Sequence, residues 1–200
     1  MTQGLTLWLT GLPASGKTQI ATRIEEALLE RGLDAERLDE GEWRQDWLPG
    51  LGFTASDEDN LNRLVGHVCH LLTRNGVIAV AAAVSPSQDV RNEIRGQIGR
   101  FVEVHLRCPA EICQSRDPAG NGAKALSGSL RGFPGVDRTY EEPVNPEVLL
   151  DTGSDDAESC VKQVLRTLEL MEWIPRQEGS DYNPEEEAKI SQRLKDLGYV

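Results

Sequence analysis

The chain lacks several features that mark other classes of protein. Its four cysteines form no C-x-x-C pair and no dense framework, so we expect free thiols and a reducing, cytoplasmic location. No apolar run is long enough to span a membrane, and no basic stretch precedes an apolar segment near the start. We therefore expect neither a membrane partner nor a secretion signal. Basic charge is scarce as well, and the net charge of −12 argues against binding to nucleic acid.

A chain of 200 residues is long enough for one α/β domain with its own core and scarcely long enough for two. Strand and helix signals alternate along it, which predicts a three-layer α/β sandwich: a mainly parallel sheet with helices on both faces. We expect strands at 5–10, 35–39, 76–84, 101–106 and 147–151. We expect helices at 17–31, 58–75, 88–98, 109–116 and 155–171.

The first junction between a strand and a helix carries the pattern G-x-x-x-x-G-K-[ST]. Its residues are Gly11, Leu12, Pro13, Ala14, Ser15, Gly16, Lys17 and Thr18. A strand, a glycine-rich turn and a helix in this order form the phosphate cradle of a P-loop NTPase-type fold. In such a cradle Lys17 reaches the β- and γ-phosphates and Thr18 ligates Mg²⁺. The chain is therefore predicted to bind a nucleoside triphosphate, and ATP with Mg²⁺ is the expected pair.

Two stretches interrupt the alternation of strands and helices. Residues 117–146 are rich in glycine and carry Lys124, Arg131 and Arg138, which is typical of a functional lid over a site. Residues 173–200 form a tail in which Asn183 and Pro184 predict the start of a short helix, docked on the main domain or on a partner chain. We therefore expect a P-loop kinase domain at 1–172 and a separate C-terminal tail.

Several segments together resemble the adenylylsulfate (APS) kinase family. They are Leu7 to Thr18, Ser85-Pro86, Cys108-Pro109, Arg116-Asp117-Pro118, Gly132 to Asp137, and Tyr140-Glu141-x-Pro143-x-Asn145-Pro146. The similarity covers about residues 3–170, and the combination is specific to that family among P-loop kinases. The resemblance implies transfer of the γ-phosphoryl group of ATP to the 3′-hydroxyl of APS or a related small, nucleotide-like acceptor, in a homodimer.

The resemblance also implies roles for particular residues. Arg116 matches the arginine that contacts ATP at the base of the lid, and Lys17 and Asp39 complete the expected catalytic set. Thr18 and Asp39 are the expected ligands of Mg²⁺. The expected acceptor-binding residues are Arg44, Phe53, Ser85, Arg91, Lys124 and Phe133. The two phenylalanines match family aromatics that stack on either face of the acceptor's adenine.

The acceptor side departs from the family pattern at a pair of carboxylates. The family reads Leu-Asp-Gly-Asp with an arginine three residues further on; here Asp39 and Arg44 are kept, but Gly41 replaces the second aspartate. That aspartate would orient or deprotonate the attacking hydroxyl. Glu40 and Glu42 are candidate substitutes, although each lies one residue out of register and would point elsewhere on a strand end.

The following helix departs from the family as well. Glu58 stands where the family has an arginine that meets the phosphosulfate, Leu61 stands in place of an asparagine, and Gln88 replaces a further arginine. A pair of unit charges at ~4 Å is worth about 4 kcal/mol at an effective dielectric of roughly 20, so these changes disfavour a strongly anionic acceptor. An altered acceptor, or a nucleotide-binding module without turnover, therefore stays open as an alternative. A GTPase-like switch is disfavoured because no N-K-x-D motif appears.

Overall fold

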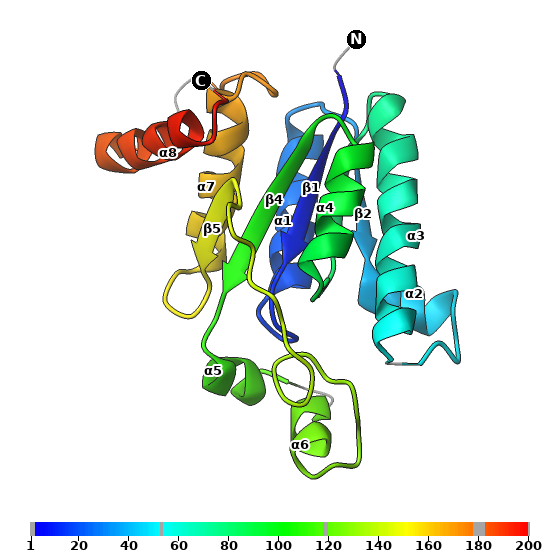
Figure 1. The fold of residues 1–200 in the computed structure, drawn as a ribbon. Coiled ribbons are helices and arrows are strands. Elements are labelled where there is room, and N and C mark those ends of the chain that lie inside the picture. The colour runs from blue at the N-terminus through cyan, green and yellow to red at the C-terminus, as the bar shows by residue number, and fades with distance from the viewer. Residues whose placement is uncertain (1–2, 53, 118–119, 178–182, 200) are drawn as a thin grey trace.

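The structure, a computed structural model, describes residues 3–52, 54–117, 120–177 and 183–199. Its strands form one parallel sheet in the order β2-β3-β1-β4-β5 (Figure 1). The strands are β1 (Leu5–Thr10), β2 (Ala35–Asp39), β3 (Ile78–Ala82), β4 (Phe101–Arg107) and β5 (Val148–Asp151). The predicted three-layer sandwich with a parallel sheet is confirmed.

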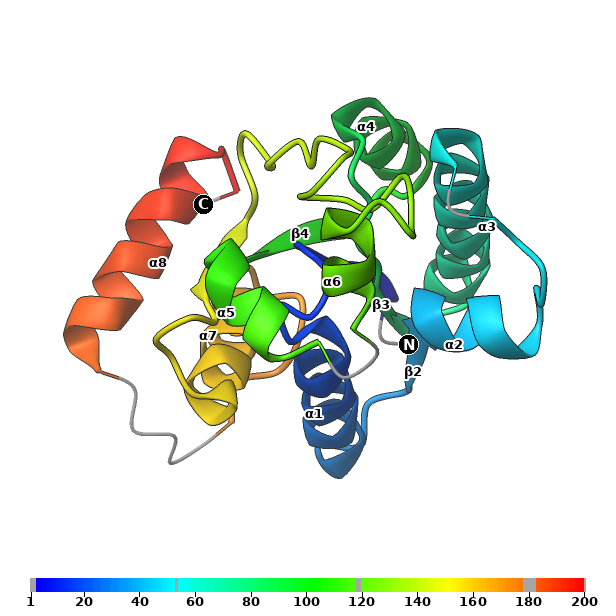
Figure 2. The ribbon, with the colours of Figure 1, turned by 90° about the horizontal axis from the view of Figure 1, so that it is seen from below.

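Helices cover both faces of this sheet (Figure 2). They are α1 (Lys17–Glu30), α2 (Glu40–Asp46), α3 (Ala55–Arg74), α4 (Gln88–Gln97), α5 (Ala110–Ser115), α6 (Asn121–Leu126), α7 (Ala157–Leu170) and α8 (Pro184–Asp196). One apolar cluster joins the sheet to α1, α7 and α8, and a second joins its other face to α3 and α4. Among the described helices, none combines the length and the apolar character needed to cross a membrane.

The side chains of the central strand β1 pack against the helices on both faces of the sheet. Leu5, Leu7 and Leu9 belong to the cluster with α1 and α7, whereas Trp8 belongs to the cluster with α3 and α4. Side chains alternate between the two faces of a strand, and a central strand covered on both faces is apolar throughout. The strand therefore delivers Gly11, the first residue of the glycine-rich loop, to the carboxyl edge of the sheet.

The structure differs from the predicted elements at several places. The predicted strand at 76–84 shortens to β3, because Gly76 has a φ of +87° in a turn and Ser85 has a φ of +45° in the loop that follows. Helices α2 and α6 are not predicted from the sequence. Both are short, and Gly41 in α2 weakens the helical signal there.

The segment predicted as a lid lies beyond the carboxyl ends of the strands (Figures 1 and 2). Its turn is held locally, because the Asp137 carboxylate accepts hydrogen bonds from the backbone N–H groups of Gly132 (2.8 Å) and Phe133 (2.6 Å). One ion pair reaches out of the segment: Arg138 Nη2 lies 3.2 Å from Asp59 Oδ1 at the start of α3. The segment predicted as a lid thus contacts α3.

The C-terminal helix α8 packs on the layer that contains α7. Leu194 is fully buried in that cluster, and Arg193 Nε donates a hydrogen bond to the Pro146 carbonyl oxygen at 2.8 Å. These contacts join the tail to the body of the molecule. The division into a domain at 1–172 and a tail at 173–200 stays a prediction.

Candidate active site

The glycine-rich loop takes a shape that two of its positions allow only for glycine. A Cβ added to Gly11 would lie 2.6 Å from the Leu106 carbonyl oxygen, and Gly16 has a φ of +98° at the start of α1. Within the loop the Ser15 hydroxyl is buried and has no hydrogen-bond partner. A buried polar group without a partner is costly unless a ligand satisfies it. The loop is therefore shaped to receive a polar ligand such as a phosphate.

Lys17 lies over this loop. Its Nζ donates to the carbonyl oxygens of Gly11 (3.0 Å) and Leu12 (2.8 Å), and only 8% of the residue is exposed. Burial lowers the pKa of Lys17, while the nearby charges of Glu40 and Asp39 oppose that shift. An ammonium group held by two carbonyls and close to acidic groups is available to exchange these partners for phosphate oxygens.

Thr18 and Asp39 meet at the ends of α1 and β2. The Thr18 hydroxyl donates to Asp39 Oδ2 at 2.6 Å, and Asp39 Oδ1 accepts from the N–H groups of Gly41 (2.8 Å) and Glu42 (3.3 Å). Asp39 is thereby the N-cap of α2, a role indicated by a capping residue followed three residues later by a glutamate. The hydroxyl and carboxylate oxygens lie side by side, and Mg²⁺ prefers oxygen ligands of this kind.

No cluster of three or more histidine, cysteine, aspartate or glutamate side chains that could hold a metal occurs within the described ranges. Thr18 and Asp39 are therefore the protein oxygens that a phosphate-bound Mg²⁺ would meet here. Magnesium sites at phosphates commonly use one or two carboxylates, substrate oxygens and water, so the donor set fits this ion.

Glu40 lies at the first position of α2, directly after β2. Its Oε1 accepts a hydrogen bond from the Val84 N–H at 2.8 Å, and its Oε2 is buried without a partner. Burial raises the pKa of Glu40 to about 7; the Glu58 charge adds to this shift and the Lys17 charge opposes it. The expected direction of Glu40 assumes a strand end, but the strand ends at Asp39 and Glu40 belongs to α2, so the alternation of a strand does not set the direction of its side chain.

Glu42, the other candidate substitute for the missing aspartate, lies on the surface. Its carboxylate pairs with Arg37 Nη2 at 2.8 Å and 3.0 Å. This pair holds the Glu42 side chain on Arg37 at the exposed face of α2. Of the two glutamates, Glu40 is the one that contributes to the candidate site.

Arg44 is engaged by groups of the protein itself. Its Nη2 lies 2.6 Å from Glu58 Oε1, and its Nη1 donates to the Gly52 carbonyl oxygen at 2.5 Å. Glu58 is only 4% exposed, and burial raises the pKa of its carboxyl group while the Arg44 charge lowers it. Glu58, which stands in place of a family arginine, therefore neutralises the charge of Arg44, the arginine that is kept. Leu61 packs in the apolar cluster with α3 and α4.

Arg91 is 1% exposed, and its donors are taken by protein acceptors. Nε bonds to Glu103 Oε1 at 2.8 Å, Nη1 to the Ser85 carbonyl oxygen at 2.5 Å, and Nη2 to Gln88 Oε1 at 2.8 Å. The guanidinium therefore holds the loop after β3 in place. That loop carries the strained backbone of Ser85, whose hydroxyl is buried without a partner. We infer that Arg91 acts on the site through this loop.

The other predicted site residues come from the lid and its base. Arg116 ends α5, and its Nη1 donates to the Thr152 carbonyl oxygen at 2.9 Å. Lys124 is exposed on α6. Phe133 lines a hollow beside Leu12 of the glycine-rich loop. Phe53, its predicted stacking partner, lies outside the described residues.

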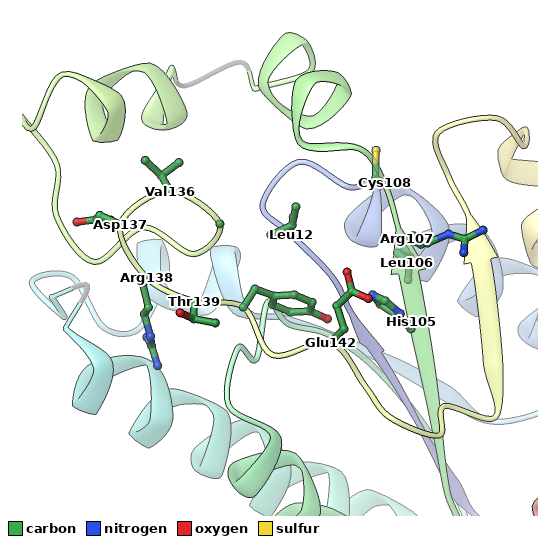
Figure 3. A pocket seen from close by; sticks show the side chains of 12 residues that line it. Leu12, His105, Leu106, Arg107, Cys108, Val136, Asp137, Arg138, Thr139 and Glu142 are labelled. Atoms are coloured by element: carbon green, nitrogen blue, oxygen red, sulfur yellow. The ribbon is translucent and has the colours of Figure 1, made fainter.

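A cavity of about 400 Å³ adjoins the glycine-rich loop, between Leu12, the end of β4 and the returning lid segment 135–142 (Figure 3). His105 and Glu142 supply polar lining. Burial lowers the pKa of His105, and the Glu142 charge opposes that shift. This cavity is not predictable from the sequence, because His105 lies in a stretch with the pattern of a buried strand.

The comparisons with known proteins agree with the motifs. The family model for adenylylsulphate kinase matches residues 3–151. The adenylyl-sulfate kinase of Rippkaea orientalis is 42% identical over 174 residues, which cover 87% of this chain and 96% of that protein. The probable adenylyl-sulfate kinase of Pyrococcus abyssi is 40% identical, over 86% of this chain and 99% of its own length.

Solved structures give the same result. The APS kinase of Mycobacterium tuberculosis in complex with AMPPNP and APS matches with a TM-score of 0.79 at 34% identity, over 84% of this chain and 99% of that chain. The shikimate kinase of Aquifex aeolicus has a TM-score of 0.52 at 16% identity, over 82% of this chain and 96% of that chain, and shares the fold alone. The predicted P-loop kinase fold is confirmed.

Proposed function

This chain belongs to the adenylylsulfate kinase family, and from that premise we propose that it phosphorylates the 3′-hydroxyl of APS or a closely related nucleotide with ATP. In this reaction the hydroxyl oxygen forms a bond to the γ-phosphorus as the bond from that phosphorus to the β,γ-bridging oxygen breaks. The products are ADP and the phosphorylated nucleotide, and the hydroxyl proton is released to water. Catalysis of such a transfer depends on positioning and on charge stabilisation.

The observation that carries the proposal is the geometry of the glycine-rich loop. Its shape requires glycine at two positions, its Ser15 hydroxyl lacks a partner, and the Lys17 ammonium lies across its carbonyl groups. We propose that Lys17 exchanges Gly11 and Leu12 for oxygens of the β- and γ-phosphates. The N-terminus of α1 adds its positive dipole end to the same place.

We propose Mg²⁺ as the companion of ATP, held by Thr18 and Asp39. Their adjacent oxygens support this assignment, since Thr18 Oγ1 and Asp39 Oδ2 are 2.6 Å apart. When bound, the ion supplies positive charge that offsets the negative charge of the phosphates. Because Asp39 also caps α2, the same carboxylate ties the donor site to the helix that begins with Glu40.

We propose that Arg116 contacts the nucleotide at the base of the lid and that Phe133 and Phe53 hold the acceptor's base. Arg116 lies at the end of α5, where the chain turns toward the lid, and Phe133 lies beside the glycine-rich loop. Lys124 and Ser85 stay predicted acceptor contacts. Arg91 supports the site from behind, as a positioning residue for the loop of Ser85.

We also propose a homodimer working in the cytoplasm. The family resemblance supports the dimer, which sedimentation of the purified chain would test. The cytoplasmic location is supported by four cysteines that are all buried and unpaired, as is usual in a reducing compartment.

An assay of ADP release, run with APS and with a panel of nucleotides that lack the sulfate, tests the proposed function. We expect the wild-type chain to release ADP only when an acceptor nucleotide is present, and to prefer APS. The Lys17→Ala variant serves as the inactive control. ADP release that ignores every added nucleotide would contradict the proposal.

A further inference from the structure

Glu40 lies where the two sheet strands of the acceptor side end. It follows β2 directly, and the adjacent strand β3 leads to Val84, whose N–H donates to Glu40 Oε1 at 2.8 Å. The Val84 carbonyl oxygen accepts from the Thr10 hydroxyl at 2.7 Å, so the same residue is also anchored to the end of β1. These bonds hold the Glu40 carboxylate at the carboxyl edge of the sheet, where ligands bind in folds of this kind.

One oxygen of this carboxylate has nothing to bind. Of the described side chains, Glu40 holds the one buried carboxylate oxygen, Oε2, without a hydrogen-bond partner. A carboxylate oxygen buried in this way costs stability, because it loses its water without gaining a donor. The Ser85 hydroxyl, next in the chain after Val84, is also buried and unpartnered. The two orphaned oxygens thus belong to Glu40, which accepts from the Val84 N–H, and to the residue that follows Val84, and they indicate a place kept for a ligand.

The neighbours of Glu40 limit what that ligand can be. Glu40 follows Asp39, whose Oδ2 accepts from the Thr18 hydroxyl at 2.6 Å, and Lys17 directly precedes Thr18, so Glu40 and Lys17 belong to adjoining segments of the candidate site. A phosphate oxygen would be repelled by a carboxylate at this position. The group that meets Oε2 must therefore donate a hydrogen or be a cation. With Thr18 and Asp39 proposed as the Mg²⁺ ligands, an acceptor hydroxyl in line with the γ-phosphate is the donor that fits.

The neighbouring carboxylates are already occupied. Asp39 uses Oδ2 for the Thr18 hydroxyl and Oδ1 for the N–H groups that it caps. Glu42 pairs with Arg37 on the surface, and Glu58 pairs with Arg44. Among the described residues of this group, Glu40 is the carboxylate with a buried oxygen that has no partner.

We propose that Glu40 is a catalytic residue whose Oε2 accepts a hydrogen bond from the reacting hydroxyl of the nucleotide acceptor and aims its oxygen at the γ-phosphorus. This inference rests on the proposed function. It places the carboxylate lost at Gly41 one residue earlier in the chain. The longer glutamate side chain, starting at the first position of a helix, reaches Val84 at the carboxyl edge of the sheet.

The variant Glu40→Gln tests this role with little change of shape. A glutamine keeps an oxygen for the Val84 N–H but places an NH₂ group where Oε2 lies, and an NH₂ group cannot accept the hydroxyl's hydrogen. We expect kcat to fall by about 100-fold or more, the range found when a group that orients or takes a proton is removed. The Kd for ATP should not rise, because the change removes a carboxylate that repels phosphate oxygens, and the Mg²⁺ concentration at half-maximal rate should stay within about twofold.

The matched control is Glu42→Gln, which removes a neighbouring carboxylate that pairs with Arg37 and should leave kcat within about twofold. Glu40→Asp is the second variant, and we expect it to regain part of the rate because it restores an anionic oxygen. Thermal melts of all variants establish that they are folded.

The outcomes separate the inference from the function on which it rests. A wild-type chain active on a nucleotide acceptor, with Glu40→Gln equally active, overturns the role of Glu40 alone. A loss that higher Mg²⁺ restores would overturn it too, because Glu40 would then hold the metal. A wild-type chain that phosphorylates no nucleotide in the panel overturns both the inference and the proposed function.

Discussion

Single residues on the two sides of the site differ in what a ligand must displace. Lys17 donates to two neutral carbonyl oxygens, which phosphate oxygens outcompete because charged acceptors make stronger hydrogen bonds. Arg44 is paired with the buried carboxylate of Glu58, so an anion that approaches it competes with a full negative charge. The donor side is therefore open to its ligand, whereas the acceptor side is partly neutralised from within.

At the donor side, Lys17→Ala removes the one ammonium group that lies over the glycine-rich loop. A hydrogen bond to a charged group is worth about 1.5–3 kcal/mol, so we expect ATP to bind roughly 10- to 100-fold more weakly. Calorimetric titration with ATP measures the change. Lys162→Ala is the control, because this exposed lysine pairs with Glu158 on α7 far from the loop. Equal affinity of Lys17→Ala and wild type would contradict the assignment.

At the acceptor side, Glu58→Gln releases Arg44 from its ion pair. We expect the KM for APS to fall about tenfold, a part of the ~4 kcal/mol that a close charge pair can be worth at an intermediate dielectric. The KM for ATP should not change. Glu93→Gln, which breaks the exposed pair with Arg63, is the control. An unchanged or higher KM for APS in Glu58→Gln would show that Arg44 does not face the acceptor.

At the scale of elements, helices α3 and α4 pack so closely at Gly66 that a larger residue has no room there. Gly66 on α3 faces Ile94 on α4, and a Cβ at Gly66 would lie 2.8 Å from two carbons of Ile94. Ile94 is 2% exposed and belongs to the apolar cluster of this layer, so it has little freedom to move away. The glycine thus sets the distance between the two helices that cover the acceptor side.

This packing predicts opposite effects for two glycines that both lie in helices. We expect Gly66→Ala to destabilise the chain by about 1–3 kcal/mol, the cost of overpacking a core. Gly96→Ala, at an open position on α4, should stabilise it by about 0.5–1 kcal/mol, because alanine favours the helix. Urea unfolding of both variants measures the difference. A stabilised Gly66→Ala would mean that α3 and α4 separate easily.

The helices and strands also show how much of the fold can be predicted from the sequence. The strand Leu5–Thr10 and the helix that begins at Lys17 are predicted within a residue, because local periodicity and the loop pattern determine them. The helix at 40–46 is missed, although Asp39 and Glu42 carry a capping signal, because Gly41 and the preceding strand obscure it. The position of Glu40 depends on that helix, so its burial is not predictable from register alone.

Contacts between residues that are distant in the sequence set a further limit on what the sequence predicts. Arg91 is predicted to bind the acceptor, yet its guanidinium meets Glu103 on β4 and the carbonyl of Glu141 in the returning lid segment. No local sequence pattern predicts that these residues contact one another. The glycine-rich loop, in contrast, is contiguous in sequence, so its pattern can be found without knowing the fold.

For the whole molecule, ligand binding should raise the stability of the fold. ATP with Mg²⁺ at about a hundred times its Kd adds ~2.7 kcal/mol to the free energy of unfolding. For a chain of this size that corresponds to a Tm higher by roughly 5–10 °C. Thermal melts with ATP and Mg²⁺ measure the shift, and adenosine at the same concentration is the control. Equal shifts with adenosine and ATP would contradict a site built around the phosphates.

The most direct test of the account follows the γ-phosphoryl group itself. The wild-type chain is incubated with Mg²⁺, APS and ATP that carries a label in the γ-phosphate, and the labelled products are separated. We predict that the label moves to the 3′-position of the APS nucleotide and that Lys17→Ala leaves it in ATP. Label that stays in ATP with the wild-type chain, or that appears only as inorganic phosphate, would contradict the transfer.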